Sequence, residues 1–112
     1  MTRKEVAEMI ASTNLEYAYR FFPIGNAPES PPYILYFYED SDDMMADNQN
    51  YTNIENLVIE LYLTDERTFE EEDTLDAILI QNQQTYSKTE EYIEDTNMYR
   101  ITYETEVVIH GE

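Results

Sequence analysis

Hydrophobic side chains recur at two different periods along the chain, and these periods predict its secondary structure. A helical period predicts helices over residues 2–13 and 68–83. The apolar stripes of these helices are formed by Val6, Met9, Ile10 and Thr13 and by Leu75, Ile78 and Leu79. Each helix opens with a threonine followed three residues later by a glutamate, the spacing of a capping box: Thr2 with Glu5, and Thr68 with Glu71.

A period of two, or a continuous apolar run, predicts five strands. Their approximate bounds are 15–22, 33–38, 54–63, 86–94 and 98–109. One face of the third strand is formed by Leu57, Ile59, Leu61 and Leu63. In the last strand the apolar positions are Tyr99, Ile101, Tyr103, Val107 and Ile109, which alternate with Arg100, Glu104 and Glu106. We therefore expect these two strands to bury one face and expose the other.

Two segments interrupt this pattern. Residues 23–32 contain all four prolines and read as a loop, because proline cannot donate a hydrogen bond to a sheet. Residues 39–53 are polar, acidic and without a period, and a loop of that length is usually functional or disordered. The predicted order is α-β-β-β-α-β-β in one domain spanning 1–112. Its fold class is α+β, with two helices packed on one face of a mainly antiparallel sheet.

Composition narrows the classes of function. The 112 residues include 25 acidic and 6 basic side chains, a net charge of −19, which argues against binding to nucleic-acid phosphates or anionic lipid. Hydrophobic residues make up 42% of the chain, too many for a disordered acidic tail. The absence of cysteine excludes disulfides and thiolate chemistry. No apolar run approaches the roughly 20 residues that span a bilayer, and the N-terminal segment does not resemble a secretory signal.

Catalytic and metal-binding motifs are weak. The single histidine, His110, lies near the C-terminus and reads as a surface side chain. Acidic pairs such as Glu60 with Glu104 arise by chance in so acidic a chain, and two glycines cannot build a phosphate-binding loop. Asp40 begins a run like that of a calcium loop, but Met45 and Tyr51 stand where Gly and Glu are needed. Only adventitious divalent cation binding is left open, and we expect neither an enzyme nor a cofactor.

The excess of negative charge has three explanations that composition leaves open. It can serve solubility alone, it can imitate the DNA backbone and capture a basic DNA-binding protein, or it can line a channel through which DNA slides. The 11 tyrosines are too many for a core of this size to hide completely. Because tyrosine is favoured at protein–protein interfaces, some of them are candidates for contact with a partner.

A succession of short runs resembles a known family. The runs are Tyr19–Pro23, Ala27–Pro28, Pro31–Tyr36, Asn53–Tyr62, Tyr86–Glu94 and Met98–Glu104. In this order and spacing they resemble the tail terminator, or tail completion, proteins of long-tailed phages and prophages of Gram-positive bacteria. The resemblance implies an α+β fold and a hexameric ring that caps the tail tube, ends its polymerisation and joins it to the head connector. It also implies location at the tail–head junction of the virion, after assembly in the host cytoplasm.

The resemblance transfers no catalytic residue, so interface residues are predicted from exposure, aromaticity and charge. Candidates for contact with a neighbouring subunit, the major tail tube protein or the head connector are Glu39, Asp40, Asp42, Asp43, Met44, Met45, Tyr33, Tyr36 and Tyr38. Candidates for the lining of an acidic lumen are Glu70, Glu71, Glu72 and Asp73. The rival hypothesis is an acidic DNA mimic that inhibits a basic host protein as a small species rather than as a ring.

Overall fold

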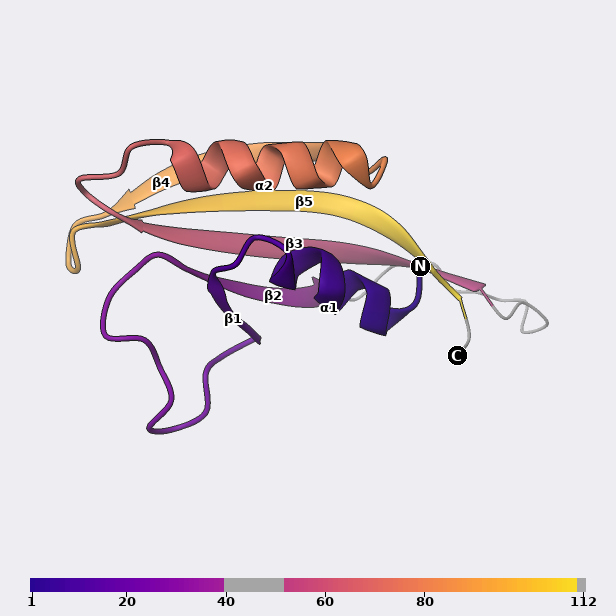
Figure 1. Cartoon of the computed structure of the whole chain (residues 1–112), viewed down its shortest axis with the longest axis horizontal. Helices are drawn as coiled ribbons and strands as arrows, with labels where there is room; N and C mark the ends of the chain where they lie inside the picture. Colours follow the sequence, from indigo (N-terminus) through magenta and orange to yellow (C-terminus); the bar gives the residue numbers. More distant parts are fainter. Residues whose placement is uncertain (40–51, 111–112) are drawn as a thin grey trace.

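Two helices and five strands follow one another in the predicted order. The computed structural model describes residues 1–39 and 52–110. The elements are α1 (Arg3–Ala11), β1 (Glu16–Tyr19), β2 (Tyr33–Glu39), β3 (Thr52–Thr64), α2 (Glu70–Gln81), β4 (Tyr86–Ile93) and β5 (Met98–His110) (Figure 1). The α+β class and the order α-β-β-β-α-β-β are therefore confirmed. Within the described residues, neither helix is long and apolar enough to cross a membrane.

All five strands join one sheet in the order β1-β2-β3-β5-β4. Three of its pairings are antiparallel, but β1 runs parallel to β2, so the sheet is mixed. A parallel pair needs a long crossover to bring the chain back to the starting end of the first strand. Residues 20–32 make that return, because the strand predicted for 15–22 ends at Tyr19 and the connection starts before the proline-rich segment 23–32. A hairpin turn would have been too short.

The core lies between one face of the sheet and both helices (Figure 1). The alternation predicted for β3 holds, because Leu57, Ile59 and Leu61 are fully buried while their neighbours turn to the other face. In β5, Ile101 and Tyr103 are likewise fully buried. The helices contribute Val6, Met9, Ile10, Leu75, Ile78 and Leu79 to the same cluster. Burial of these side chains is the main source of stability, at about 25 cal/mol per Å² of apolar surface.

The two helices begin differently. In α1 the predicted capping box is present: Thr2 Oγ1 accepts a hydrogen bond from the Glu5 amide at 3.1 Å, and Glu5 Oε1 accepts one from the Thr2 amide at 2.9 Å. The capping box predicted for Thr68 and Glu71 is wrong. Helix α2 begins at Glu70. The residue before it, Phe69, has a left-handed backbone with a φ of 73°, and no side chain caps the first turn of the helix.

The start of the chain lies along β5. The Met1 amino group donates to the Val108 carbonyl at 2.9 Å, and the His110 amide donates to the Met1 carbonyl at 3.0 Å. These bonds satisfy backbone groups of β5 beyond the point where its pairing with β4 stops at Thr105. The His110 side chain is exposed, as predicted, although its backbone belongs to the strand.

Candidate functional site

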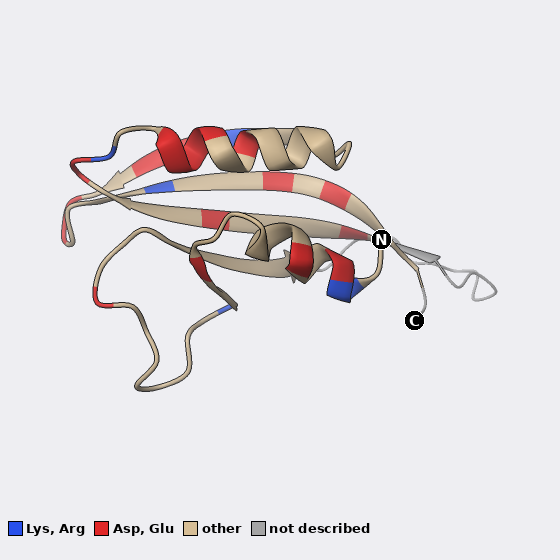
Figure 2. Ribbon diagram, viewed as in Figure 1, with Lys and Arg blue, Asp and Glu red and all other residues tan. Residues whose placement is uncertain are grey.

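One face of the sheet has no helix on it, and we call it the helix-free face. The strand register places on it the side chains that alternate with the core: Tyr33, Leu35 and Phe37 of β2, Val58, Glu60 and Tyr62 of β3, and Arg100, Thr102, Glu104 and Glu106 of β5. Figure 2 shows that acidic residues recur along β3 and β5. An uncovered face that mixes aromatic and acidic side chains is suited to contact with another protein.

The three tyrosines predicted for an interface are divided between the two faces of β2. Tyr33 lies on the helix-free face and stacks on Tyr62, with ring centroids 5.0 Å apart. Tyr36 is 8% exposed and belongs to the core, so its side chain packs inside the subunit. Tyr38 is half-buried at the margin of that core, where burial raises its pKa to about 12. Side chains two residues apart share a face, so Tyr33 cannot act together with the other two.

The Tyr33–Tyr62 pair contacts two further side chains. Phe22 packs nearly perpendicular to Tyr33, with centroids 5.5 Å apart, and the Tyr62 hydroxyl donates to Glu60 Oε1 at 3.0 Å. Partial burial raises the pKa of Tyr33 and of Tyr62, so both are neutral at physiological pH. Glu60, nominated above with Glu104 as an acid–base pair, is thus engaged by a tyrosine.

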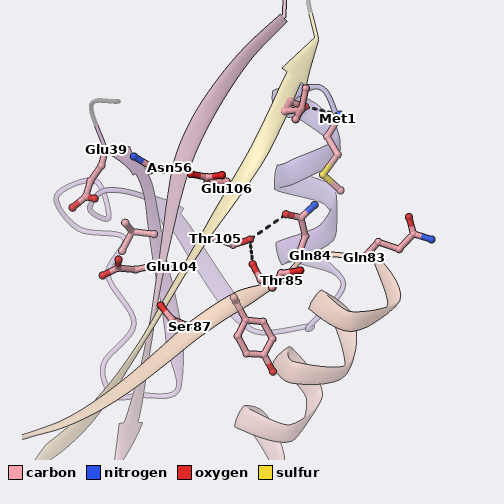
Figure 3. Close-up of a pocket in the computed structure, with 13 residues that line it drawn as sticks. Met1, Glu39, Asn56, Gln83, Gln84, Thr85, Ser87, Glu104, Thr105 and Glu106 are labelled. Atoms are coloured by element: carbon pink, nitrogen blue, oxygen red, sulfur yellow. Dashed lines mark hydrogen bonds between the residues drawn. The ribbon is translucent and has the colours of Figure 1, made fainter. Parts of the chain in front are cut away.

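An open depression of about 890 Å³ lies where β4 begins beside β5 (Figure 3). In the described part of the chain its lining includes the carboxylates of Glu39, Glu104 and Glu106 but no Lys or Arg. Hydroxyl and amide groups of Thr105, Thr85 and Gln84 line its other side, and Thr105 Oγ1 donates to the Thr85 carbonyl at 2.6 Å. Glu60 is not in this lining, so the depression does not bring the nominated carboxylate pair together. No cluster of three or more potential metal ligands occurs among residues 1–39 and 52–110.

Of the other predicted interface residues, Glu39 is exposed at the end of β2, at the rim of this depression. Asp40, Asp42, Asp43, Met44 and Met45 lie outside the described residues. The structure describes only the residues on either side of that segment, the end of β2 at Glu39 and the start of β3 at Thr52.

The four acids predicted for a lumen occupy the first turn of α2, where the positive end of the helix dipole stabilises them. Glu70 and Asp73 are exposed and Glu71 is half-buried, so these three contribute to an acidic outer surface (Figure 2). Glu72 differs because it is buried, at 9% exposure, and points toward the sheet. Its carboxylate forms ion pairs with Arg67 and Lys88.

Glu72 belongs to a partly buried ionic cluster that the sequence did not reveal, in which the Lys88 and Glu90 side chains are 31% and 51% exposed. Arg67, whose side chain is 5% exposed, pairs with Glu72 through Nη2 and with Glu90 at 2.7 Å through Nη1. Lys88 Nζ lies 2.7 Å from Glu72 Oε2 and 3.0 Å from Asp76 Oδ2. Desolvation alone would lower the pKa of Lys88, but its bonds to the two carboxylates outweigh that effect and raise it.

Aromatic rings enclose this cluster. The Arg67 guanidinium lies 4.2 Å from the Phe69 ring and 4.8 Å from the Tyr99 ring, and Lys88 lies 5.6 Å from the Tyr103 ring. Burial raises the pKa of Tyr103 strongly, and hydrogen bonding and charge from Asp76 add to the shift. The cluster joins residues that are far apart in the sequence and come from the β3–α2 loop, α2 and β4. No local sequence motif therefore predicts it.

The loop predicted for residues 23–32 carries exposed apolar side chains that the sequence analysis did not single out. Residues 20–32 project away from the sheet as an arm (Figure 1). The arm carries two large apolar side chains in solvent, Phe21 and Ile24, of which Ile24 is fully exposed. Apolar residues inside a proline-rich loop were the signal that could have identified this surface.

The resemblance to tail terminator proteins stays a prediction. No protein-family model matches the chain, and no curated protein matches it in sequence. A proposal for the function therefore has to rest on the fold and on the surfaces described above.

Proposed function

We propose that the chain is a structural protein of phage tail assembly that caps the tail tube as a homo-oligomeric ring, of six subunits, and joins it to the head connector. The observation that carries this proposal is the separation of two kinds of surface. Exposed acids gather at the start of α2, while most of the exposed large apolar side chains lie elsewhere, around β1 and where β3 pairs with the end of β5. Phe69 and Ile80 are the exposed apolar side chains beside α2 itself. A ring subunit needs both, one facing the path of DNA and others facing its neighbours.

The acidic surface supports passage of DNA rather than its retention. Glu70, Glu71 and Asp73 lie together on one helical turn, within a chain whose net charge is −19. Phosphates passing such a wall are repelled at distances up to a Debye length, about 8–10 Å at physiological ionic strength. Lys88 and Arg67, the two cations nearest to these acids in sequence, are occupied by internal ion pairs and offer no phosphate site.

Electron microscopy of tail-tube assembly tests the proposal directly. Purified major tail tube protein is polymerised with and without this chain, and with an unrelated acidic protein of similar charge as the control. We expect a cap at one end of each tube and shorter tubes only with this chain. Uncapped tubes of unchanged length would contradict the proposal, and capture of a basic host protein by a monomer would then favour the DNA-mimic hypothesis.

The role of the acids is tested separately from capping. A variant with Glu70→Gln, Glu71→Gln and Asp73→Asn should still cap tubes but should slow delivery of the genome, because the lumen loses its repulsive charge. The matched control neutralises three other exposed acids, Glu8, Glu29 and Glu94, by Gln substitution. If virions carrying either variant are equally infectious, the proposal that Glu70, Glu71 and Asp73 line the lumen is wrong.

A further inference from the structure

The helix-free face carries a band of apolar side chains that lies outside the core. The band consists of Leu35 and Phe37 of β2 and Val58 of β3, and Phe37 lies directly opposite Val58 in the strand register. Leu35 and Phe37 are half-buried. Val58 is 4% exposed, yet it does not belong to the core cluster on the other face of the sheet. An apolar row that packs outside the core is a surface suited to contact with another molecule.

Three carboxylates surround one end of this apolar band (Figure 3). Glu104 lies beside Val58 on the neighbouring strand, and Glu39 and Glu106 lie on either side of Asn56 in the next row of the sheet. All three glutamates are exposed, and all three line the depression described above. Within residues 1–39 and 52–110, none of the three forms an ion pair.

The opposite end of the same face has partners for its charges. Glu60 accepts a hydrogen bond from the Tyr62 hydroxyl at 3.0 Å, and Arg100 pairs with Glu91. The unpaired negative charge of the helix-free face is therefore concentrated beside the depression. Neighbouring carboxylates on one face of a sheet repel each other. A cation placed between them removes that repulsion and forms charge-assisted hydrogen bonds.

A second copy of the chain has too few cations to fill this site. Four of its six basic residues already form ion pairs: Arg3, Arg67, Lys88 and Arg100. Arg20 donates to the Tyr38 carbonyl and lies over the Phe37 ring of the helix-free face itself. Only Lys4 of α1 is left for three carboxylates, and two helix-free faces brought together would set acids against acids. The basic side chains therefore come from another protein.

The dimensions of the apolar band fit an α-helix. Strand β2 has seven residues, so it is about 23 Å long at roughly 3.3 Å per residue. A helix of about 16 residues has that length at about 1.5 Å per residue. Two neighbouring strands are together about 10 Å wide, which is close to the diameter of a helix. Helices α1 and α2 already cover the other face, and a sheet with helices on both faces is a common arrangement of layers.

We propose that the helix-free face binds a basic amphipathic helix of another protein. The apolar stripe of that helix covers the apolar band, and Arg or Lys side chains on one flank enter the depression. An arginine suits this position because its methylene groups pack on Val58 while its guanidinium pairs with Glu104 and Glu106. The inference goes beyond the proposed function, since it names the chemistry of a partner and applies equally to a ring subunit and to a single chain.

A designed peptide tests the charge of the site. The probe is a fluorescent peptide of about 16 residues with leucines at helical spacing and arginines on both flanks, and anisotropy measures its binding. The site variant combines Glu39→Gln, Glu104→Gln and Glu106→Gln. The control is the triple variant at the start of α2 described above, which has the same net charge. We expect the site variant to bind at least about tenfold more weakly than the control. Equal losses would overturn the proposal, because total charge alone would then attract the peptide.

The apolar band is tested with the same assay. A peptide of identical composition but scrambled order has no apolar stripe and should bind at least about tenfold more weakly to the unaltered chain. Leu35→Gln should weaken binding of the amphipathic peptide about fivefold and leave binding of the scrambled peptide unchanged. Equal binding of the two peptides would overturn the proposal. Circular dichroism confirms that each variant is folded.

Disulfide formation locates the bound helix, because the chain has no cysteine of its own. The peptide carries one cysteine on its basic flank. Ser87→Cys places a thiol at the lining of the depression, and Ala77→Cys places one on α2 at the other side of the sheet; both positions are exposed. We expect a cross-link with Ser87→Cys and only background with Ala77→Cys, and equal yields would overturn the proposal.

Two further outcomes are distinguished by simple measurements. Sedimentation velocity detects self-association, and a dimer of the unaltered chain that the site variant abolishes would identify a second copy as the occupant and overturn the proposal. Peptide binding requires no tail tube, so it is measured independently of tube capping. Peptide binding without capping supports this inference and contradicts the proposed function, whereas capping by a chain that does not bind the peptide does the reverse.

Discussion

Two regions at opposite edges of the sheet each hold an arginine beside aromatic rings: residues 65–95 around α2 and β4, the α2–β4 edge, and residues 16–32 around β1, the β1 edge. In the first, Arg67 lies between two aromatic rings and two carboxylates, and its side chain is 5% exposed. In the second, Arg20 also lies over two aromatic rings, but both it and the neighbouring Tyr19 are exposed. The difference is that Arg67 pairs with acids and joins elements of the core, whereas the contacts of Arg20 are a backbone carbonyl and ring faces at the surface.

Removal of Arg67 should have the largest effect on stability. Arg67→Ala removes the buried guanidinium from Glu72, and breaking a buried pair from one side costs about 3–5 kcal/mol when the remaining charge has no partner. Because Lys88 still pairs with Glu72 at 2.7 Å, we expect a loss at the lower end of that range, about 3 kcal/mol. Urea unfolding followed by circular dichroism measures the change in the free energy of unfolding. Arg67→Lys serves as the control, because it keeps the charge and should recover part of the loss. A change below about 1 kcal/mol for Arg67→Ala would contradict the view that this cluster holds the edge together.

Alkaline pH should weaken the α2–β4 edge next. The pKa of Tyr103 is raised in the folded state, so above about pH 10 the unfolded chain loses this proton while the folded chain keeps it. The pKa of Lys88 is also raised, so its stabilising pairs are complete below the pKa of an unfolded lysine and are lost as pH rises through the folded value.

As the pH rises from about 10 to about 11.5, the free energy of unfolding should fall by about 2 kcal/mol, because the unfolded chain loses these protons before the folded chain does. Each proton linked to folding in this way is worth about 1.4 kcal/mol per pH unit. Urea unfolding at a series of pH values measures this slope. In Tyr103→Phe the slope should be shallower, because the phenylalanine has no proton to lose. An identical slope in the variant would show that Tyr103 does not control alkaline stability.

The two helix starts offer a matched pair of smaller effects. Thr2→Ala should cost about 1 kcal/mol, because the Thr2 hydroxyl caps the Glu5 amide at the start of α1. Thr68→Ala should cost less than about 0.5 kcal/mol, because α2 begins after Phe69 and has no side-chain cap. Thermal unfolding of both variants compares them under one condition. Equal losses would mean that Thr68 acts as a cap in solution.

A small effect on stability is also expected at the β1 edge. Arg20→Ala removes an exposed side chain whose contacts are one backbone carbonyl and ring faces, so the free energy of unfolding should fall by less than about 0.5 kcal/mol. Urea unfolding followed by circular dichroism measures the change under the conditions used for Arg67→Ala. A loss as large as that of Arg67→Ala would erase the difference between the edges.

Two predicted details of the elements are wrong. The strand predicted for 15–22 ends at Tyr19. The capping box predicted for Thr68 and Glu71 is absent, because the helix begins at Glu70, and the neighbouring Arg67 pairs with Glu72 and Glu90. Among the candidate site residues, Glu72 was predicted to line a lumen together with Glu70, Glu71 and Asp73, but it is buried. Its burial depends on Arg67 and Lys88, which sequence spacing cannot connect to it.

Alternation and helical period, read from the sequence, determined the order of the seven elements and the buried face of β3 and β5, because burial of apolar side chains dominates local choice. Charge and composition determined that the surface is acidic. Tertiary structure alone decided that β1 pairs parallel to β2, that β5 lies between β3 and β4, and that two arginines beside aromatic rings have opposite exposure. The reason is that strand pairing and side-chain burial arise from contacts between residues far apart in the chain, which no local pattern records.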